Sequence, residues 1–307
     1  MTSDTAPSAS PSPGPEPVSV PSPAPRLGAG PLGIGLRSLA AIAILVVANL
    51  AVVPFTAVLS AVPGLRELGS ELSWATLGIY ACLGSVMWGT AVLLAWLWVR
   101  FVERRRLADI GLRFTPSSAL WLLLATLAAM GVVLGTAAVL PSTGPAPSPE
   151  QVAEQGPFLM VLLMMLIPAF LVQGFPEELL FRGMLLSAMR SRPVLAVAVA
   201  TLSFTIIHLV SNGWQQTLGD RFLFLVMPFG FSLFATALLV WTRSLWAAVG
   251  VHGGMHLGTN FSQLLPPTDP ALSWTVAGVV FAVLGVAILA VLLKRGRGIP
   301  DGAERWR

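Results

Sequence analysis

Eight long apolar stretches run through this sequence, and they constrain its fold more than any other feature. They lie near residues 37–62, 74–99, 118–140, 158–189, 194–211, 222–242, 245–262 and 272–293. Each approaches or exceeds the roughly 20 residues that an α-helix needs to cross the hydrocarbon layer of a membrane. Because lipid cannot satisfy free backbone N–H and C=O groups, these segments are predicted to be helices. The sequence therefore predicts an all-α, polytopic membrane protein with eight transmembrane helices.

The overall composition agrees with this class and excludes another. Of the 307 residues, 55% are hydrophobic and only 10% are charged, which is too little charge to cover the surface of a soluble domain. A pI of about 10.5 would suggest nucleic-acid binding in a soluble protein. Here the basic residues flank the apolar spans, which is the usual sign of membrane orientation. We therefore exclude nucleic acid as a partner and expect the lipid bilayer to be one.

The two ends of the chain differ in composition from the region between them. Residues 1–34 are rich in Pro, Ser, Ala and Gly, and such a segment is predicted to be a disordered tail. Residues 295–307 form a short basic tail. Between the tails, residues 35–294 are predicted to form one membrane domain.

Basic residues fall unevenly on the two sides of the predicted bundle. Eight spans place both termini on the same side, and that side receives 16 of the 18 Lys and Arg residues. The other side keeps only Arg66 and Arg221. By the positive-inside rule, the chain is predicted to be a multi-pass protein of the cell membrane with both termini and both tails in the cytoplasm.

Three of the predicted spans carry ionisable residues that are costly to bury in lipid. Such a side chain costs ~2.5–3.5 kcal/mol at mid-bilayer on insertion scales, so it usually faces the bundle interior and often marks function. The fourth span carries two glutamates and an arginine, and the fifth and seventh spans carry every histidine of the chain. These residues are Glu177, Glu178 and Arg182, then His208, and then His252 and His256.

The two adjacent glutamates are predicted to have different roles. Glu178 and Arg182 stand four residues apart, so they share one helical face and can form a structural ion pair. Such pairing offsets much of the cost of burying either charge. Glu177 is rotated by ~100° from Glu178, and Pro176 lacks a backbone N–H and can bend the helix beside it. Glu177 is therefore predicted to be available for chemistry.

The depths of these residues along their helices indicate one common layer. A tight turn joins the fourth and fifth spans and brings Glu177 close to the level of His208. Counted from the cytoplasmic ends of their spans, Glu177 lies about 20 Å deep, and His252 and His256 lie roughly 13 and 20 Å deep. One carboxylate and three imidazoles are therefore expected to surround one wet cavity.

These three segments resemble the CAAX prenyl protease and bacteriocin-processing family of intramembrane proteases, also called the Abi family. The family pattern is Glu-Glu-x-x-x-Arg, Phe-x-x-x-His and His-x-x-x-Asn on separate transmembrane helices of an eight-helix core. The matching residues are Glu177, Glu178 and Arg182, then Phe204 and His208, and then His252, with His256 in place of the asparagine. The resemblance covers roughly residues 155–262, which form the predicted protease core.

The resemblance implies an endopeptidase that hydrolyses a peptide bond in a membrane-associated protein or peptide. In the eukaryotic relatives the substrate is lipidated, since they remove the last three residues from a prenylated Cys-a-a-X terminus. Amide hydrolysis needs an activated water and stabilisation of the oxyanion. We expect Glu177 to act as the general base, His208 to help hold the water, and His252 and His256 to donate hydrogen bonds to the oxyanion.

A metal ion is the alternative to this scheme. The family is described both as metalloprotease and as glutamate-dependent without an established metal. Glu177, His208, His252 and His256 supply oxygen and nitrogen ligands, and His-x-x-x-His is a common Zn²⁺ spacing on a helix. The sequence leaves the requirement for zinc open.

Two other functions compete with proteolysis. A non-catalytic immunity or scaffold protein would keep the same residues for binding, and a transporter would use buried carboxylates and histidines as a proton relay. The complete set of three motifs favours the protease over the binding protein. The clustering of ionisable groups in one layer, rather than in a chain across the membrane, argues against the transporter.

Overall fold

The structure, a computed structural model, describes residues 26–68, 72–300 and 306. Helices dominate this part of the chain, which contains no β-strand and only one isolated bridge, between Ser142 and Thr268. The all-α class is therefore confirmed. The predicted N-terminal tail lies outside the described residues up to position 25, and the first helix already begins at Pro31.

The helices follow one another along the chain with short connections. In order they are α1 (Pro31–Leu50), α2 (Val53–Ala61), α3 (Pro63–Leu68), α4 (Trp74–Phe101), the 3₁₀-helix η1 (Leu107–Ile110), α5 (Pro116–Val139), α6 (Pro149–Glu154), α7 (Phe158–Leu166), the π-helix η2 (Ile167–Gly174), α8 (Phe175–Glu178), the π-helix η3 (Leu179–Leu186), α9 (Pro193–Ile207), the 3₁₀-helix η4 (His208–Val210), α10 (Leu218–Phe224), α11 (Val226–Thr242), α12 (Leu245–Ser262) and α13 (Pro270–Lys294).

Seven helical segments among the described residues are long and apolar enough to cross a membrane. They are Pro31–Ala61, Trp74–Phe101, Pro116–Val139, Phe158–Leu186, Pro193–Val210, Leu218–Thr242 and Pro270–Lys294, and each overlaps a predicted span. The remaining predicted span is α12, which is helical but less apolar because it carries His252, His256 and Asn260. The chain is therefore a multi-pass membrane protein, and its most polar long helix is one of its most buried.

Short polar residues and prolines mark where several of these helices begin. The side chains of Ser73, Thr115 and Asp269 accept hydrogen bonds from backbone N–H groups in the first turns of α4, α5 and α13. These caps satisfy donors that have no partner within the helix. Proline stands in the first helical turn of α1, α5, α9 and α13, where a missing N–H costs nothing.

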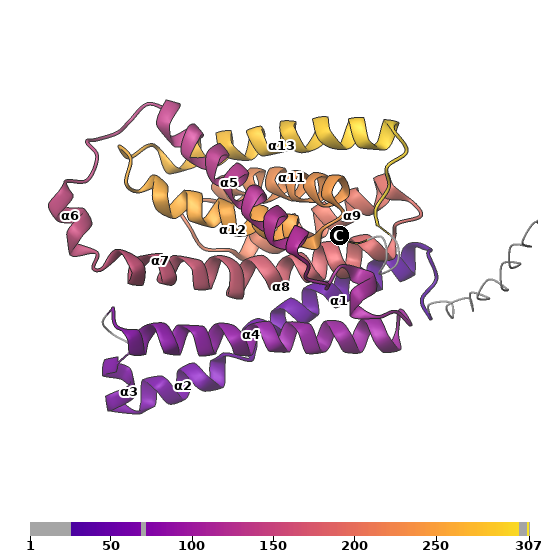
Figure 1. The fold of residues 1–307 in the computed structure, drawn as a ribbon, viewed down its shortest axis with the longest axis horizontal. Coiled ribbons are helices and arrows are strands. Elements are labelled where there is room, and N and C mark those ends of the chain that lie inside the picture. Colours follow the sequence, from indigo (N-terminus) through magenta and orange to yellow (C-terminus); the bar gives the residue numbers. More distant parts are fainter. Residues whose placement is uncertain (1–25, 69–71, 301–305, 307) are drawn as a thin grey trace, which may run out of the picture.

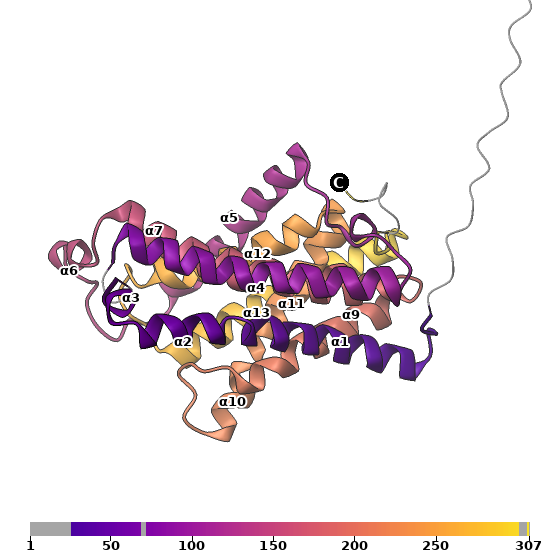
Figure 2. The same ribbon diagram turned by 90° about the horizontal axis from the view of Figure 1, so that it is seen from below.

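The helix bundle has two distinct ends. Helix α1 begins and α13 ends at the right in Figure 1, which we call the terminus end, whereas α3 and α6 lie at the left, which we call the far end. At the terminus end, Arg37 of α1 pairs with Glu103 after α4, with 2.7 Å between Nε and Oε1. At the far end, the Thr143 N–H donates to the carbonyl of Pro267 at 2.7 Å. Figure 2 shows α1 and α4 side by side along one flank of the bundle.

Glycines on α12 allow it to lie very close to α5. A Cβ atom on Gly250 would stand 2.4 Å from the carbonyl oxygen of Leu122, and one on Gly254 would stand 2.3 Å from that of Thr126. Gly258 continues this series, because its Cβ would stand 2.8 Å from Val133. Small residues at four-residue spacing let two helices approach backbone to backbone in a membrane. The helix that carries two of the three histidines is therefore held firmly in the bundle.

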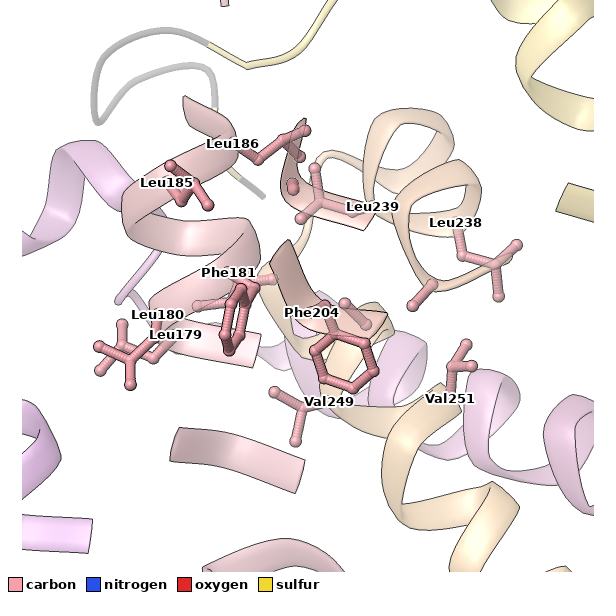
Figure 3. Close-up of a cluster of buried hydrophobic side chains, with 14 of the residues drawn as sticks. Leu179, Leu180, Phe181, Leu185, Leu186, Phe204, Leu238, Leu239, Val249 and Val251 are labelled. Carbon is pink, nitrogen blue, oxygen red and sulfur yellow. The ribbon is translucent and has the colours of Figure 1, made fainter. Parts of the chain in front are cut away.

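The apolar core extends through the bundle and is continuous from α1 to α13. Figure 3 shows its centre, where side chains of η3 meet Phe204 of α9 and residues of α11 and α12. Phe181, Leu185 and Phe204 are completely inaccessible to solvent. Close packing of this kind is what holds helices together where lipid removes most of the hydrophobic driving force.

Candidate active site

The two glutamates of the fourth span lie in an irregular stretch of helix. They belong to the short α8, which stands between the π-helices η2 and η3. Pro176 has no backbone N–H and so cannot continue the regular hydrogen-bond ladder. π-helical turns are rare and occur frequently at functional sites. The sequence predicts an ordinary helix with a proline bend here, and the two π-helices are an addition to that prediction.

Glu178 is held by two partners in the interior of the bundle. Its Oε1 lies 3.0 Å from Nη1 of Arg182, and both side chains are fully inaccessible. The same oxygen lies 3.0 Å from Nδ1 of His252, which comes from α12. The spacing of Glu178 and Arg182 had predicted their contact, whereas the bond to His252 was not foreseen. Glu178 therefore joins the fourth span to the histidine helix.

Aromatic rings cover the guanidinium of Arg182. Its Cζ lies 4.5 Å from the ring centre of Phe204 and 5.6 Å from that of Phe231. Cation–π attraction of this kind is strongest where water is excluded. Phe204, expected only from the Phe-x-x-x-His motif, thus helps to stabilise a buried charge.

Hydrogen bonds fix which nitrogen carries the proton in two of the imidazoles. Nδ1 of His208 lies 2.8 Å from the carbonyl oxygen of Phe204, and a carbonyl can only accept a hydrogen bond. Nδ1 of His252 faces the carboxylate of Glu178, which likewise accepts. In both neutral rings the hydrogen therefore stands on Nδ1, and Nε2 keeps its lone pair.

The four residues predicted to be catalytic line one cavity. This cavity has a volume of about 480 Å³ and is lined by residues of α1, η2, α8, α9, η4, α10, α11, α12 and α13. Its lining includes Glu177, His208, His252 and His256. The rings of His252 and His256 are stacked with 5.2 Å between their centres. The expected grouping of one carboxylate with three imidazoles is present, and their chemical roles stay predictions.

Glu177 differs from its neighbour in lacking a partner. Its Oε2 is buried and has no hydrogen-bond partner among the described residues. The side chain as a whole is 8% exposed and reaches the cavity. A buried carboxylate oxygen without a partner is costly, so such groups are rare and often have a functional reason.

Sequence reasoning missed two amide side chains in the cavity wall. Gln173 stands four residues before Glu177 on the same span, and its side chain forms no hydrogen bond within the described part of the chain. Asn49 of α1 also lines the cavity and donates from Nδ2 to the carbonyl of Leu45 at 2.9 Å. An amide one turn from a glutamate in an apolar span was the signal that could have identified Gln173.

The spacing of the possible ligands bears on the zinc alternative. No group of three or more His, Cys, Asp or Glu side chains in the described ranges lies close enough together to hold one. Nδ1 of His208 and of His252 is already engaged, so Nε2 is the atom of each ring that could bind a ligand. The zinc site therefore stays a prediction from the sequence, and no chemical step is assigned to a metal.

Comparison with known families agrees with this arrangement. Residues 159–258 match the profile of a family described as type II CAAX prenyl endopeptidase Rce1-like. Over these residues, the chain is similar to the Rce1-like family. The match begins in α7 and ends in α12, so it spans the candidate site and lies within the predicted protease core. At the level of this family, the chain is an intramembrane protease of the CAAX type. No curated protein matches the chain.

Proposed function

We propose that this protein is an intramembrane endopeptidase in which Glu177 activates the attacking water. Its substrate would be a membrane-associated protein or peptide. The observation that carries the proposal is the position of Glu177. It lines a cavity shared with three imidazoles and is free of the ion pair that engages the adjacent Glu178.

A general base must be unengaged and within reach of the proton that it removes. Glu177 lies outside the ion pair of Glu178, and its place in the cavity wall would bring it within reach of a bound water. It would take a proton from water as the oxygen attacks the peptide carbonyl carbon. The same proton would then pass to the leaving amine nitrogen as the C–N bond breaks, which returns the carboxylate to its starting state.

His208 is suited to orient this water. Its Nδ1–H is bound to the Phe204 carbonyl, so the Nε2 lone pair can accept one hydrogen of the water molecule. The other hydrogen is then free to point at Glu177. His208 would thus position the nucleophile, in agreement with the role expected from the sequence.

For the hydrogen bonds to the oxyanion, we propose a pair of donors other than the pair of His252 and His256. A neutral His252 with its proton on Nδ1 presents a lone pair at Nε2 and cannot donate from that atom. An amide donates without changing its protonation state. Gln173 would therefore be one donor and His256 the other, while Glu178 holds the ring of His252 in place.

The decisive experiment compares Glu177 with an exposed glutamate outside the cavity. Purified parent protein and Glu177→Gln would be incubated in liposomes with membrane peptides, including a prenylated Cys-a-a-X peptide, and cleavage read by mass spectrometry. Loss of a general base should lower the rate by ~10²–10⁴-fold. Glu150→Gln, which changes an exposed carboxylate of α6, is the matched control and should cleave at the parent rate. Equal cleavage by Glu177→Gln would remove Glu177 from the mechanism.

Metal removal separates the two chemical schemes. The proposal expects parent activity to survive treatment with a strong zinc chelator, followed by assay in metal-free buffer. Loss of activity that is restored by adding Zn²⁺ alone would instead support the zinc alternative predicted from the sequence.

A further inference from the structure

The cavity extends from the middle of the bundle toward the far end. Helix α1 starts at the terminus end, and its lining residues are confined to its second half, from Ile42 to Leu50. Helix α12 also starts there, and its lining begins at His252. Helices α11 and α13 start at the far end, and their lining residues lie within their first two turns, up to Phe231 and at Trp274.

The opposite half of the bundle closes the cavity floor. Glu178 and Arg182 are fully inaccessible, and every residue of η3 beyond them is buried. Leu239 and Leu245, where α11 ends and α12 begins, are at most 1% exposed. A polypeptide cannot reach Glu177 from the terminus end without displacing this packed core.

Polar residues mark the rim of the cavity at the far end. Ser211 and Asn212 follow η4 in the loop before α10, and Asn212 is exposed. Asn49, near the end of α1, is also exposed. The side walls are apolar and include Val46, Ile207 and other aliphatic residues. Water therefore has a polar entrance at the far end, and an apolar peptide segment has a matching wall.

The charge distribution assigns a side of the membrane to each end. The predicted spans place 16 of the 18 basic residues on the side of the termini and leave Arg66 and Arg221 on the other. The positive-inside rule makes the terminus end cytoplasmic. The far end, with the mouth of the cavity, is then extracytoplasmic.

We propose that the active-site cavity opens to the extracytoplasmic side of the membrane. Its substrates would be membrane-associated polypeptide segments presented in the extracytoplasmic leaflet, such as apolar anchors of exported proteins. The part of this inference that concerns substrates rests on the proposed protease function. A lipidated C-terminus in the cytoplasm would lie on the wrong side of the packed core.

Cysteine accessibility tests the direction of the cavity without relying on activity. Cys82 is the single cysteine and would be replaced by alanine. Single cysteines would then be placed at the far end by Asn212→Cys or Gln216→Cys, and at the terminus end by Gly298→Cys or Ser117→Cys, all at exposed positions. A membrane-impermeant maleimide would be applied to spheroplasts, to inverted vesicles and to solubilised protein.

The proposal expects the far-end cysteines to be labelled in spheroplasts and the terminus-end cysteines to be labelled in inverted vesicles. The reverse pattern would overturn it. Two positions at each end guard against one variant that fails to fold, and labelling after solubilisation shows that each thiol can react.

The cavity itself is tested by Asn49→Cys in the same background. We expect labelling of this thiol from the spheroplast side, and labelling only from inverted vesicles would overturn the proposal. Because labelling does not need hydrolysis, the orientation can fail while Glu177 remains essential for cleavage, and the protease assignment can fail while the orientation holds.

Discussion

The terminus end and the active-site cavity bury a carboxylate in two different ways. At the terminus end, Arg37 and Glu103 are 4% and 3% exposed and are paired with each other. In the cavity wall, Glu177 has a buried carboxylate oxygen without a partner among the described residues. Paired charges and close packing serve stability, whereas an unpartnered group beside a cavity is poised for chemistry. We expect changes in the first region to alter unfolding and changes in the second to alter turnover.

The largest expected effect on stability comes from the paired charges. Arg37→Met would leave the Glu103 carboxylate buried and unpaired, and loss of one partner of a buried pair costs ~3–5 kcal/mol. The free energy of unfolding would be measured by denaturant titration in mixed micelles. The double variant Arg37→Met/Glu103→Leu should recover much of the loss. If the double variant keeps the parent turnover per folded molecule, the pair serves stability alone. A large loss of turnover in the double variant would contradict this separation of roles.

Gln173 lines the cavity, and its substitution is expected to lower turnover and to leave stability almost unchanged. Removing one oxyanion donor typically lowers kcat by ~10²–10³-fold. Gln173→Glu keeps the shape of the side chain but lacks its N–H donors, so kcat should fall by this amount. Its effect on KM and on unfolding should be small. A fall in stability with unchanged kcat would show that Gln173 serves packing instead.

Glycine packing between α5 and α12 should give a smaller effect on stability. Gly250→Ala places a methyl group against the backbone of α5, and overpacking of this kind typically costs ~1–3 kcal/mol. Gly131→Ala on α5 is the matched control, because no atom lies within 4 Å of its added Cβ. Unfolding of the two variants would be compared under identical conditions. Equal free energies of unfolding for the two variants would mean that α5 and α12 can move apart without a loss of stability.

The smallest change in kcat is expected from His256→Asn, which restores the residue of the family pattern. An asparagine amide still offers a donor, so kcat should stay within about tenfold of the parent, whereas His256→Ala should lose the ~10²–10³-fold that a missing donor costs. Cleavage rates of the two variants would be measured side by side. Equal rates would show that position 256 does not contact the oxyanion.

Much of this architecture could be predicted from hydrophobicity and from the regular geometry of helices. Span positions follow from apolar stretches because lipid permits few alternatives to a helix. The contact between Glu178 and Arg182 follows from their spacing on a helix. The grouping of Glu177 with the histidines follows from helix rise and from one tight turn. These inferences depend on local geometry that every helix shares.

Other features depend on backbone hydrogen bonding and on the rotation of helices against each other, and a single sequence reveals neither. The π-helices around Glu177 reflect a change in backbone hydrogen bonding that leaves no mark on hydrophobic periodicity. The bond between Glu178 and His252 joins residues 74 positions apart, so it depends on how two helices rotate against each other. The place of Gln173 in the cavity wall depends on the same rotation. Long-range rotation of helices, rather than their existence, was the missing information.

The contact between His208 and Phe204 has a consequence for how the site can vary. The atom that accepts the His208 hydrogen is the main-chain oxygen four residues earlier, which every amino acid possesses. Substitution of the aromatic ring at position 204 would remove the cover over Arg182 and leave this oxygen in place. The hydrogen of the His208 ring stays on Nδ1 for as long as the last turn of α9 remains helical. Evolution can therefore reshape the walls around this histidine while the helix itself preserves its chemistry.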